Sequence, residues 1–138
     1  MNSNGGNKGA MRFKHPDDER DFLSQPAPCN VAANARLKEL IAFIERFTQM
    51  TGSGEITITS YYRPLDQDSY HSILQAADIR TKDKPESWKV AMGHLSLALK
   101  AIDPTLQIYM HPELKGTSDE HIHVAIKDGA IERMRKTA

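Results

Sequence analysis

A six-residue segment near the C-terminal end, HIHVAI at residues 121–126, alternates strictly between two kinds of side chain. Successive side chains of a β-strand point to opposite faces of the sheet. The isoleucines and the valine therefore share one face, whereas His121 and His123 share the other. An aliphatic face must be covered by helices or by a second sheet. We therefore expect a sheet with one buried face and one face on which the paired histidines project into a groove.

The rest of the chain contains helix and strand signals that suit such a sheet. Periodic apolar residues and turn signals predict a helix capped by Asn30 or Asn34 that ends before Gly52, a strand over residues 55–62, a helix from Pro85 to near Pro104, a strand over residues 106–110 and a short C-terminal helix from Ala130. A further short strand is expected before the second helix. This order favours an α+β fold in which helices pack on one face of a small, mostly antiparallel sheet.

The N-terminal segment differs in composition from the remainder. Residues 1–10 are rich in Asn and Gly, and residues 11–29 are polar and interrupted by three prolines. Such sequences are typical of tails and irregular segments. With 138 residues in all, the chain has the length of one domain. We expect a flexible N-terminal arm over residues 1–29, with little regular structure, and a single domain over residues 30–138.

The charge balance excludes a strong global electrostatic attraction to any partner. Lys plus Arg and Asp plus Glu each number 18, so the formal net charge is zero. This balance disfavours a nucleic-acid partner and an anionic membrane surface. No stretch approaches the roughly 18 apolar residues needed to span a bilayer, and no apolar signal segment follows the N-terminus. We expect a protein that is cytoplasmic as made. The composition gives no indication of the oligomeric state.

Histidines and carboxylates offer the chain one route to a metal site. Cys29 is the only cysteine, so thiolate ligands and an internal disulfide are excluded. His71 and Asp78, together with His121 or His123, provide the three N and O donors that a catalytic zinc site needs, with a fourth position left for water. Spacing alone does not distinguish this site from ordinary surface or core histidines, since two histidines at i and i+2 also occur by chance.

A carboxylate stands close to the proposed ligands. Glu120 lies three residues before His123, close enough to act on water that a metal has activated. His15, His94 and His111 have no such neighbours in the sequence, and we assign them no role.

Three short segments together resemble a known family. TSYYRP, SYHSILQAAD and EHIH occur in that order, and they resemble segments of zinc D-alanyl-D-alanine carboxypeptidases and related phage endolysins that cleave peptidoglycan. The fold of that family also occurs in the Hedgehog signalling domain. The resemblance spans roughly residues 30–126. The matching positions are Ser60, Tyr62, Arg63, Ser69, His71, Ala76, Asp78, Glu120, His121 and His123.

The resemblance implies a role for each of six residues. His71, Asp78 and His123 would hold Zn²⁺, and Glu120 would be the general base that moves a proton from water to the leaving amine. Arg63 would bind the substrate carboxylate or the developing oxyanion, and His121 would steady the tetrahedral intermediate. These roles agree with general chemistry, because a fixed cation stabilises charge that appears only in the transition state.

Three features of the chain depart from the family pattern. Leu74 stands where the family usually has glycine, and the connection from Arg63 to His71 is shorter than in most members. Strict alternation also puts Glu120 on the face opposite the histidines, unless Glu120 lies in the turn before the strand. If the strand begins earlier, Asp119 becomes the competing base.

Two functions from different classes follow from this pattern. The first is a zinc peptidase that hydrolyses an amide bond in the peptide stem of bacterial peptidoglycan, of the D-Ala-D-Ala carboxypeptidase or the L-Ala-D-Glu endopeptidase type. The alternative is a non-catalytic, zinc-stabilised binding or structural module of the Hedgehog type, which has no need of Glu120. A wall-cutting enzyme without an export signal suits a phage lysis protein that is released to the cell wall.

Overall fold

The computed structural model describes residues 11–26 and 29–137, so the tail expected over residues 1–10 lies outside the described residues. The helices are α2 (Pro16–Ser24), α3 (Val31–Met50), α4 (Glu86–Ile102) and α5 (Ala130–Thr137); the strands are β1 (Met11–Phe13), β2 (Ile56–Ser60), β3 (Ala76–Arg80), β4 (Leu106–Met110) and β5 (His121–Ile126); two short 3₁₀ segments are η1 (Tyr70–Ile73) and η2 (Pro112–Leu114).

The strands form one five-stranded sheet in the order β1-β2-β3-β5-β4. β1 runs parallel to β2, and the other three neighbouring pairs are antiparallel. The expected α+β class and the mostly antiparallel sheet are therefore confirmed.

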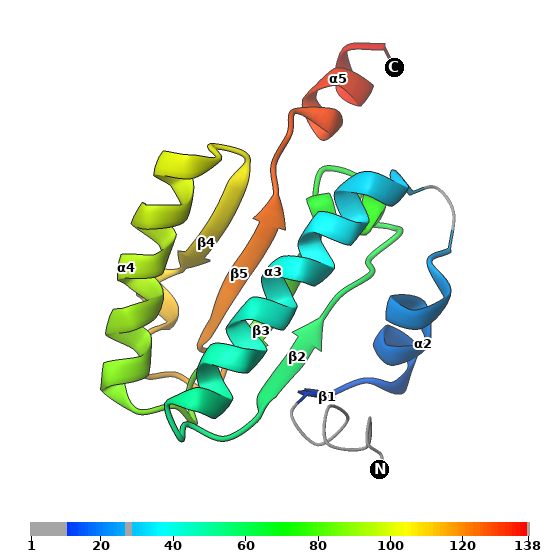
Figure 1. Cartoon of the computed structure of the whole chain (residues 1–138). Helices are drawn as coiled ribbons and strands as arrows, with labels where there is room; N and C mark the ends of the chain where they lie inside the picture. The colour runs from blue at the N-terminus through cyan, green and yellow to red at the C-terminus, as the bar shows by residue number, and fades with distance from the viewer. Residues whose placement is uncertain (1–10, 27–28, 138) are drawn as a thin grey trace.

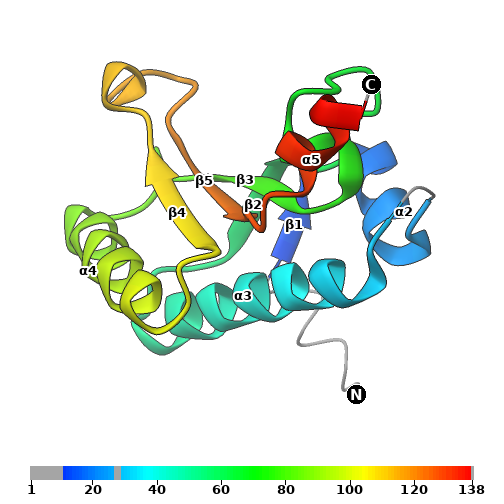
Figure 2. The same cartoon turned by 90° about the horizontal axis from the view of Figure 1, so that it is seen from above.

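Two long helices cover one face of the sheet. Figure 2 shows α3 beneath the strands, and Figures 1 and 2 show α4 beside β4 at the edge of the sheet. The alternate aliphatic residues of β2, β3 and β5 are fully buried in the core between these layers, as expected for Ile122, Val124 and Ile126. The opposite face is different, because η1 and α5 lie above one end of it, where Ile131 packs against Tyr70. The expectation that helices pack on one face thus holds for α3 and α4 but not for α5.

The segment before α3 is more ordered than its composition indicates. The expectation of an irregular arm over residues 11–29 was wrong for the part that forms β1 and α2. Phe22 of α2 packs against Phe13 of β1 and against Tyr61, with ring centroids 5.3 and 5.2 Å apart. These rings dock the edge strand and the short helix, and Asp18 and Asp21 of α2 are buried as well. Polar composition alone therefore misled the sequence prediction.

Asn30 and Asn34, the two candidate caps of α3, have separate roles. Asn30 is the N-cap, since its side-chain oxygen accepts a hydrogen bond from the backbone N–H of Ala33. Asn34 lies inside the helix and is fully buried. Its amide nitrogen donates to the hydroxyl of Tyr61 at 2.6 Å and to the carbonyl of Leu74 at 2.8 Å.

Leu74 explains one departure from the family pattern. Its backbone has φ 61 and ψ 35, in the left-handed region that favours glycine, although its side chain is fully buried in the core. The chain therefore makes the glycine-type turn between His71 and Asp78 with a leucine. The buried side chain and the hydrogen bond from Asn34 to the Leu74 carbonyl offset the cost of this conformation.

We expect Asn34→Ala to lower the free energy of unfolding by about 2–3 kcal/mol, because the Tyr61 hydroxyl and the Leu74 carbonyl would both lose a buried donor. Urea unfolding measures the change. Gln49→Ala is the control: this residue is exposed on the same helix, and its replacement should change stability by less than about 0.5 kcal/mol. Equal stabilities of the two variants would contradict the structural role of Asn34.

Candidate metal centre

His71 is fixed by a main-chain hydrogen bond at the start of a buried turn. Its residue exposure is 1%, and its Nδ1 lies 2.7 Å from the Tyr61 carbonyl oxygen. A carbonyl can only accept, so Nδ1–H is the donor and the proton of the neutral ring is on Nδ1. In the neutral ring the lone pair of Nε2 is then available to a metal, whereas in the protonated ring Nε2–H donates to Oδ1 of Asp78, which lies 3.3 Å away. This is the arrangement in which a second partner orients a metal-binding imidazole.

Asp78 and His123 are brought together by strand pairing. They lie directly opposite each other in the antiparallel pair of β3 and β5, so their side chains share the face of the sheet away from α3 and α4. Nδ1 of His123 is 2.9 Å from Oδ1 of Asp78. His71 and His123 are 52 positions apart in the sequence, yet both lie beside Asp78 in the fold.

The donor atoms of His71, Asp78 and His123 fit a divalent cation. One ligand atom of each lies within 4.8 Å of the others. Tetrahedral ligands about 2.0–2.1 Å from zinc are about 3.4 Å apart from each other. The two distances to Asp78, 3.3 and 2.9 Å, are close to that value, and the third pair of ligand atoms lies within 4.8 Å, so the three donors can converge on one ion after a small rearrangement. The expected ligand set is therefore assembled in the fold, and its donors suit a metal such as zinc.

Arg63 also reaches into this cluster. One of its terminal nitrogens lies 2.7 Å from Oδ2 of Asp78 and 3.2 Å from Nε2 of His71, while its Nε donates to the Ser60 hydroxyl. The short connection that follows is closed by a hydrogen bond from the backbone N–H of Arg63 to the His71 carbonyl. The brief loop therefore keeps Arg63 beside the predicted ligands instead of displacing it.

The Asp78 carboxyl is held in its charged form. Burial by itself raises the pKa of Asp78, but hydrogen bonds from His123 and His71 and the attraction of their charges hold the pKa far below its ordinary value. An ionised carboxylate at 5% exposure must be compensated by cations or strong donors. The four groups around it provide this compensation: Arg63, His71, His121 and His123.

His121 lies beside the ligand set. Its Nδ1 donates to the Asp119 carbonyl at 2.7 Å, and its Nε2 is 3.8 Å from Oδ2 of Asp78. The ring also meets the ring of His111, with centroids 5.8 Å apart. His111 had no assigned role, yet it lines the same pocket as the ligands. The alternation of β4 in the sequence puts His111 on the face of Tyr109, but only the structure shows that Tyr109 pairs with His123.

The pocket over the ligand set is open and polar. Its volume is about 310 Å³, and its lining residues are Arg63, Ser69, His71, Asp78, His111, Glu113, Leu114, His121 and His123. All three predicted metal ligands and two of the three predicted catalytic residues therefore border one pocket. Glu120, the third, is not among these lining residues.

The carboxylate of Glu120 is engaged by other partners. Oε1 accepts from the Thr81 hydroxyl at 2.7 Å and lies 2.8 Å from the ammonium nitrogen of Lys89, while Oε2 accepts from the backbone N–H of Gly116 at 2.9 Å. Burial by itself raises the pKa of Glu120, but these hydrogen bonds, first that from Lys89, lower it to about 2. A carboxylate with this pKa is a weak proton acceptor at neutral pH.

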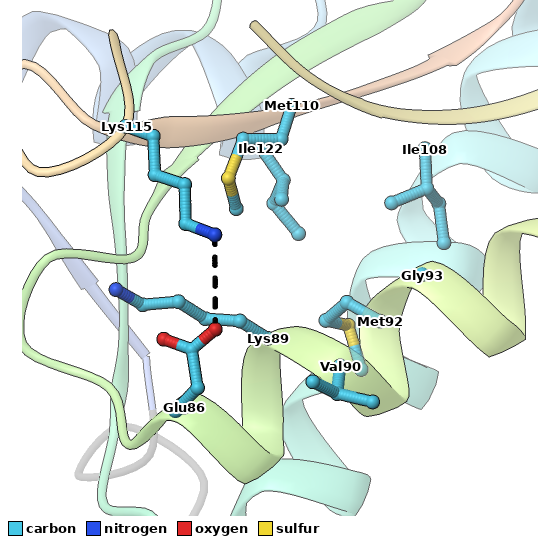
Figure 3. Close-up of a pocket in the computed structure, with 9 residues that line it drawn as sticks. All are labelled: Glu86, Lys89, Val90, Met92, Gly93, Ile108, Met110, Lys115 and Ile122. Carbon is cyan, nitrogen blue, oxygen red and sulfur yellow. Dashed lines mark ion pairs between the residues drawn. The ribbon is translucent and has the colours of Figure 1, made fainter. Parts of the chain in front are cut away.

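Lys89, the ammonium partner of Glu120, belongs to the helix layer of the fold. Lys89 belongs to α4 and lines a separate pocket between that helix and the helix-facing residues Ile108 and Ile122 (Figure 3). Glu120 lies in the turn before β5, as the sequence required for a base. Its carboxylate is nevertheless held from the helix side, and Glu120 borders a neighbouring pocket with Asp119, Asp78 and His121. These contacts do not support the role of general base expected for Glu120.

Comparisons of the chain with protein-family models, with curated proteins and with solved structures find no match. Across residues 11–26 and 29–137, no helix combines the length and the apolar character needed to cross a membrane.

Purified protein should bind about one zinc ion per chain, and His71→Ala should reduce zinc binding at least about tenfold, because the variant loses one of three ligands. Isothermal titration of metal-stripped protein with zinc measures both. His94→Ala is the matched control, since His94 is exposed on α4. Zinc binding by His71→Ala as tight as that of the control would exclude His71 as a ligand.

Glu120→Gln should lower the free energy of unfolding at pH 7 by about 1–3 kcal/mol, because Lys89 would lose a buried charged partner. The folded-state pKa of about 2 lies below the ordinary 4.5, so the stability contributed by this carboxyl is present above about pH 4.5 and is lost as the pH falls towards 2. The difference between the native chain and the variant should shrink over that window in urea titrations.

The control for this experiment is Glu113→Gln. The Glu113 side chain is 69% exposed, and its replacement should change stability by less than about 0.5 kcal/mol. A stability difference for Glu120→Gln that stays constant from pH 7 down to pH 2 would contradict the assigned contacts.

Proposed function

We propose that the chain is a zinc-dependent peptidase that hydrolyses an amide bond in the peptide stem of bacterial peptidoglycan. The observation that carries the proposal is the convergence of His71, Asp78 and His123 on one face of the sheet, within 4.8 Å of one another and at the base of an open pocket. The resemblance of the three sequence segments to zinc peptidases supplies the reaction and the substrate. A fold of the Hedgehog and D,D-peptidase type is part of the same proposal.

The residues of the chain bind and orient the substrate in this proposal. Arg63 is 42% exposed at its side chain and borders the pocket, so its cation can bind a substrate carboxylate or stabilise an oxyanion as it develops. When both ring nitrogens of His121 carry protons, Nδ1–H remains on the Asp119 carbonyl and Nε2–H is available to the tetrahedral intermediate. A bound zinc ion would polarise the scissile carbonyl and make water acidic enough to attack near neutral pH.

The alternative is a zinc-stabilised binding or structural module without catalysis. One observation favours it: Glu120 is held by Thr81, Lys89 and Gly116 and contributes to the stability of the fold. In such a module zinc would act by binding the folded state only, which contributes about 2.7 kcal/mol at a zinc concentration 100 times the Kd.

Incubation of the zinc-loaded protein with intact peptidoglycan should release fragments that mass spectrometry assigns to one cleaved stem-peptide bond. Removal of zinc with a chelator should abolish the release, and added zinc should restore it. His71→Ala should be inactive, whereas His94→Ala should retain activity.

The same experiment distinguishes the two functions. Peptidoglycan that remains intact, while zinc still raises the melting temperature of the protein, would reject the peptidase and favour the module. The released fragments would also identify the bond, D-Ala-D-Ala or L-Ala-D-Glu, and a wall substrate would require the protein to reach the wall, as in the expected phage-like release.

A further inference from the structure

A second carboxylate borders the pocket of the metal ligands. Glu113 belongs to η2, in the connection between β4 and β5, and it lines the pocket together with His71, Asp78 and His123. The pocket has a volume of about 310 Å³, which is enough for one amide group and one water. Glu113 is therefore a carboxylate that faces the same solvent space as the predicted ligands.

The surroundings of Glu113 and Glu120 differ in the property that proton transfer requires. Glu120 is 2% exposed and its two oxygens are occupied by three donors. The side chain of Glu113 is 69% exposed, and its Oε2 lies 3.3 Å from Nδ1 of His111. A general base must reach the proton that it removes, and a carboxylate with an accessible oxygen meets this condition where a buried, fully bonded one does not.

His111 is placed to orient this carboxylate. Its ring packs edge-on against Tyr109, with centroids 4.9 Å apart, and against His121, with centroids 5.8 Å apart. These two contacts come from neighbouring strands and restrict the ring, so Nδ1 stays directed at Glu113. A base oriented by a third group is a recurring arrangement in hydrolytic sites.

We propose that Glu113 is the proton-transfer residue of this pocket and that His111 is its positioning residue. The inference rests on the proposed peptidase function. In the addition step, the Glu113 carboxylate takes a proton from the attacking water as the new C–O bond forms at the scissile carbonyl carbon. In the second step the C–N bond breaks, and Glu113 returns that proton to the leaving nitrogen. The second hydrogen of the water remains on the new carboxylic acid, which ionises to solvent.

The test compares four zinc-loaded proteins for peptidoglycan hydrolysis and zinc content: the native chain, Glu113→Gln, Glu120→Gln and Glu19→Gln. Glu19 is exposed on α2 and serves as the matched glutamate control. We expect Glu113→Gln to lower kcat by about 10²–10⁴-fold while it keeps one zinc per chain. Glu120→Gln, measured below its unfolding temperature, should retain most of its kcat.

Each outcome decides the inference. A native chain without hydrolysis rejects the proposed function and the role of Glu113 together. If the native chain is active and Glu113→Gln is equally active, the role of Glu113 alone is rejected. If Glu120→Gln is strongly impaired and has normal zinc content, Glu120 is the general base. Loss of zinc by Glu113→Gln would show that Glu113 contributes to metal binding, and it would also reject the proton-transfer role of Glu113.

The role of His111 has its own measurement. His111→Ala should lower kcat with little change in KM, since the ring acts through Glu113 and not through the substrate. The variant with both His111→Ala and Glu113→Gln should be no slower than Glu113→Gln alone, because the positioned group is already absent. Losses that multiply in the double variant would show that His111 acts independently and would overturn its positioning role.

Discussion

The candidate site depends above all on the register between β3 and β5. Asp78 stands opposite His123 in this antiparallel pair, and Ile79 stands opposite Ile122 on the other face. A slip of one residue would move every side chain of a strand to the opposite face. It would bury the carboxylate beneath α3 and expose the isoleucines. Burial of the aliphatic face therefore fixes the position of the polar face. The same free energy that forms the core also brings the candidate metal ligands together.

A buried polar network extends this control from the core to His71. Asn34 of α3 donates to the Tyr61 hydroxyl and to the Leu74 carbonyl, and the carbonyl of Tyr61 accepts the proton of His71. Leu74 in its left-handed conformation closes the turn that returns the chain from His71 to β3. Because buried polar groups need partners, these hydrogen bonds allow few positions for the imidazole.

Two acidic side chains near the site have opposite surroundings. Asp78 is surrounded by imidazoles and a guanidinium and is suited to share a cation. Glu120 has three fixed donors that link the turn before β5 to α4 and to the end of β3. Because Glu120 is close to His121 and His123 in the sequence, it was expected to be a catalytic carboxylate. Its donors instead make it a link between the sheet and the helix layer. The sequence motif therefore identifies the neighbourhood of the site better than the role of each residue.

The sequence by itself determined which side chains of residues 121–126 face the core and which face the groove, because alternation is a local property of a strand. The order of the predicted elements also indicated the α+β class, and the resemblance of three short segments predicted that His71, Asp78 and His123 lie together. Only the tertiary structure decided the orientation of Glu120, since its donors come from residues as distant in sequence as Thr81 and Lys89. The meeting of His111 with His121, the position of Glu113 on the pocket wall and the docking of β1 and α2 were likewise decided by pairing and packing between separate elements, which no local pattern encodes.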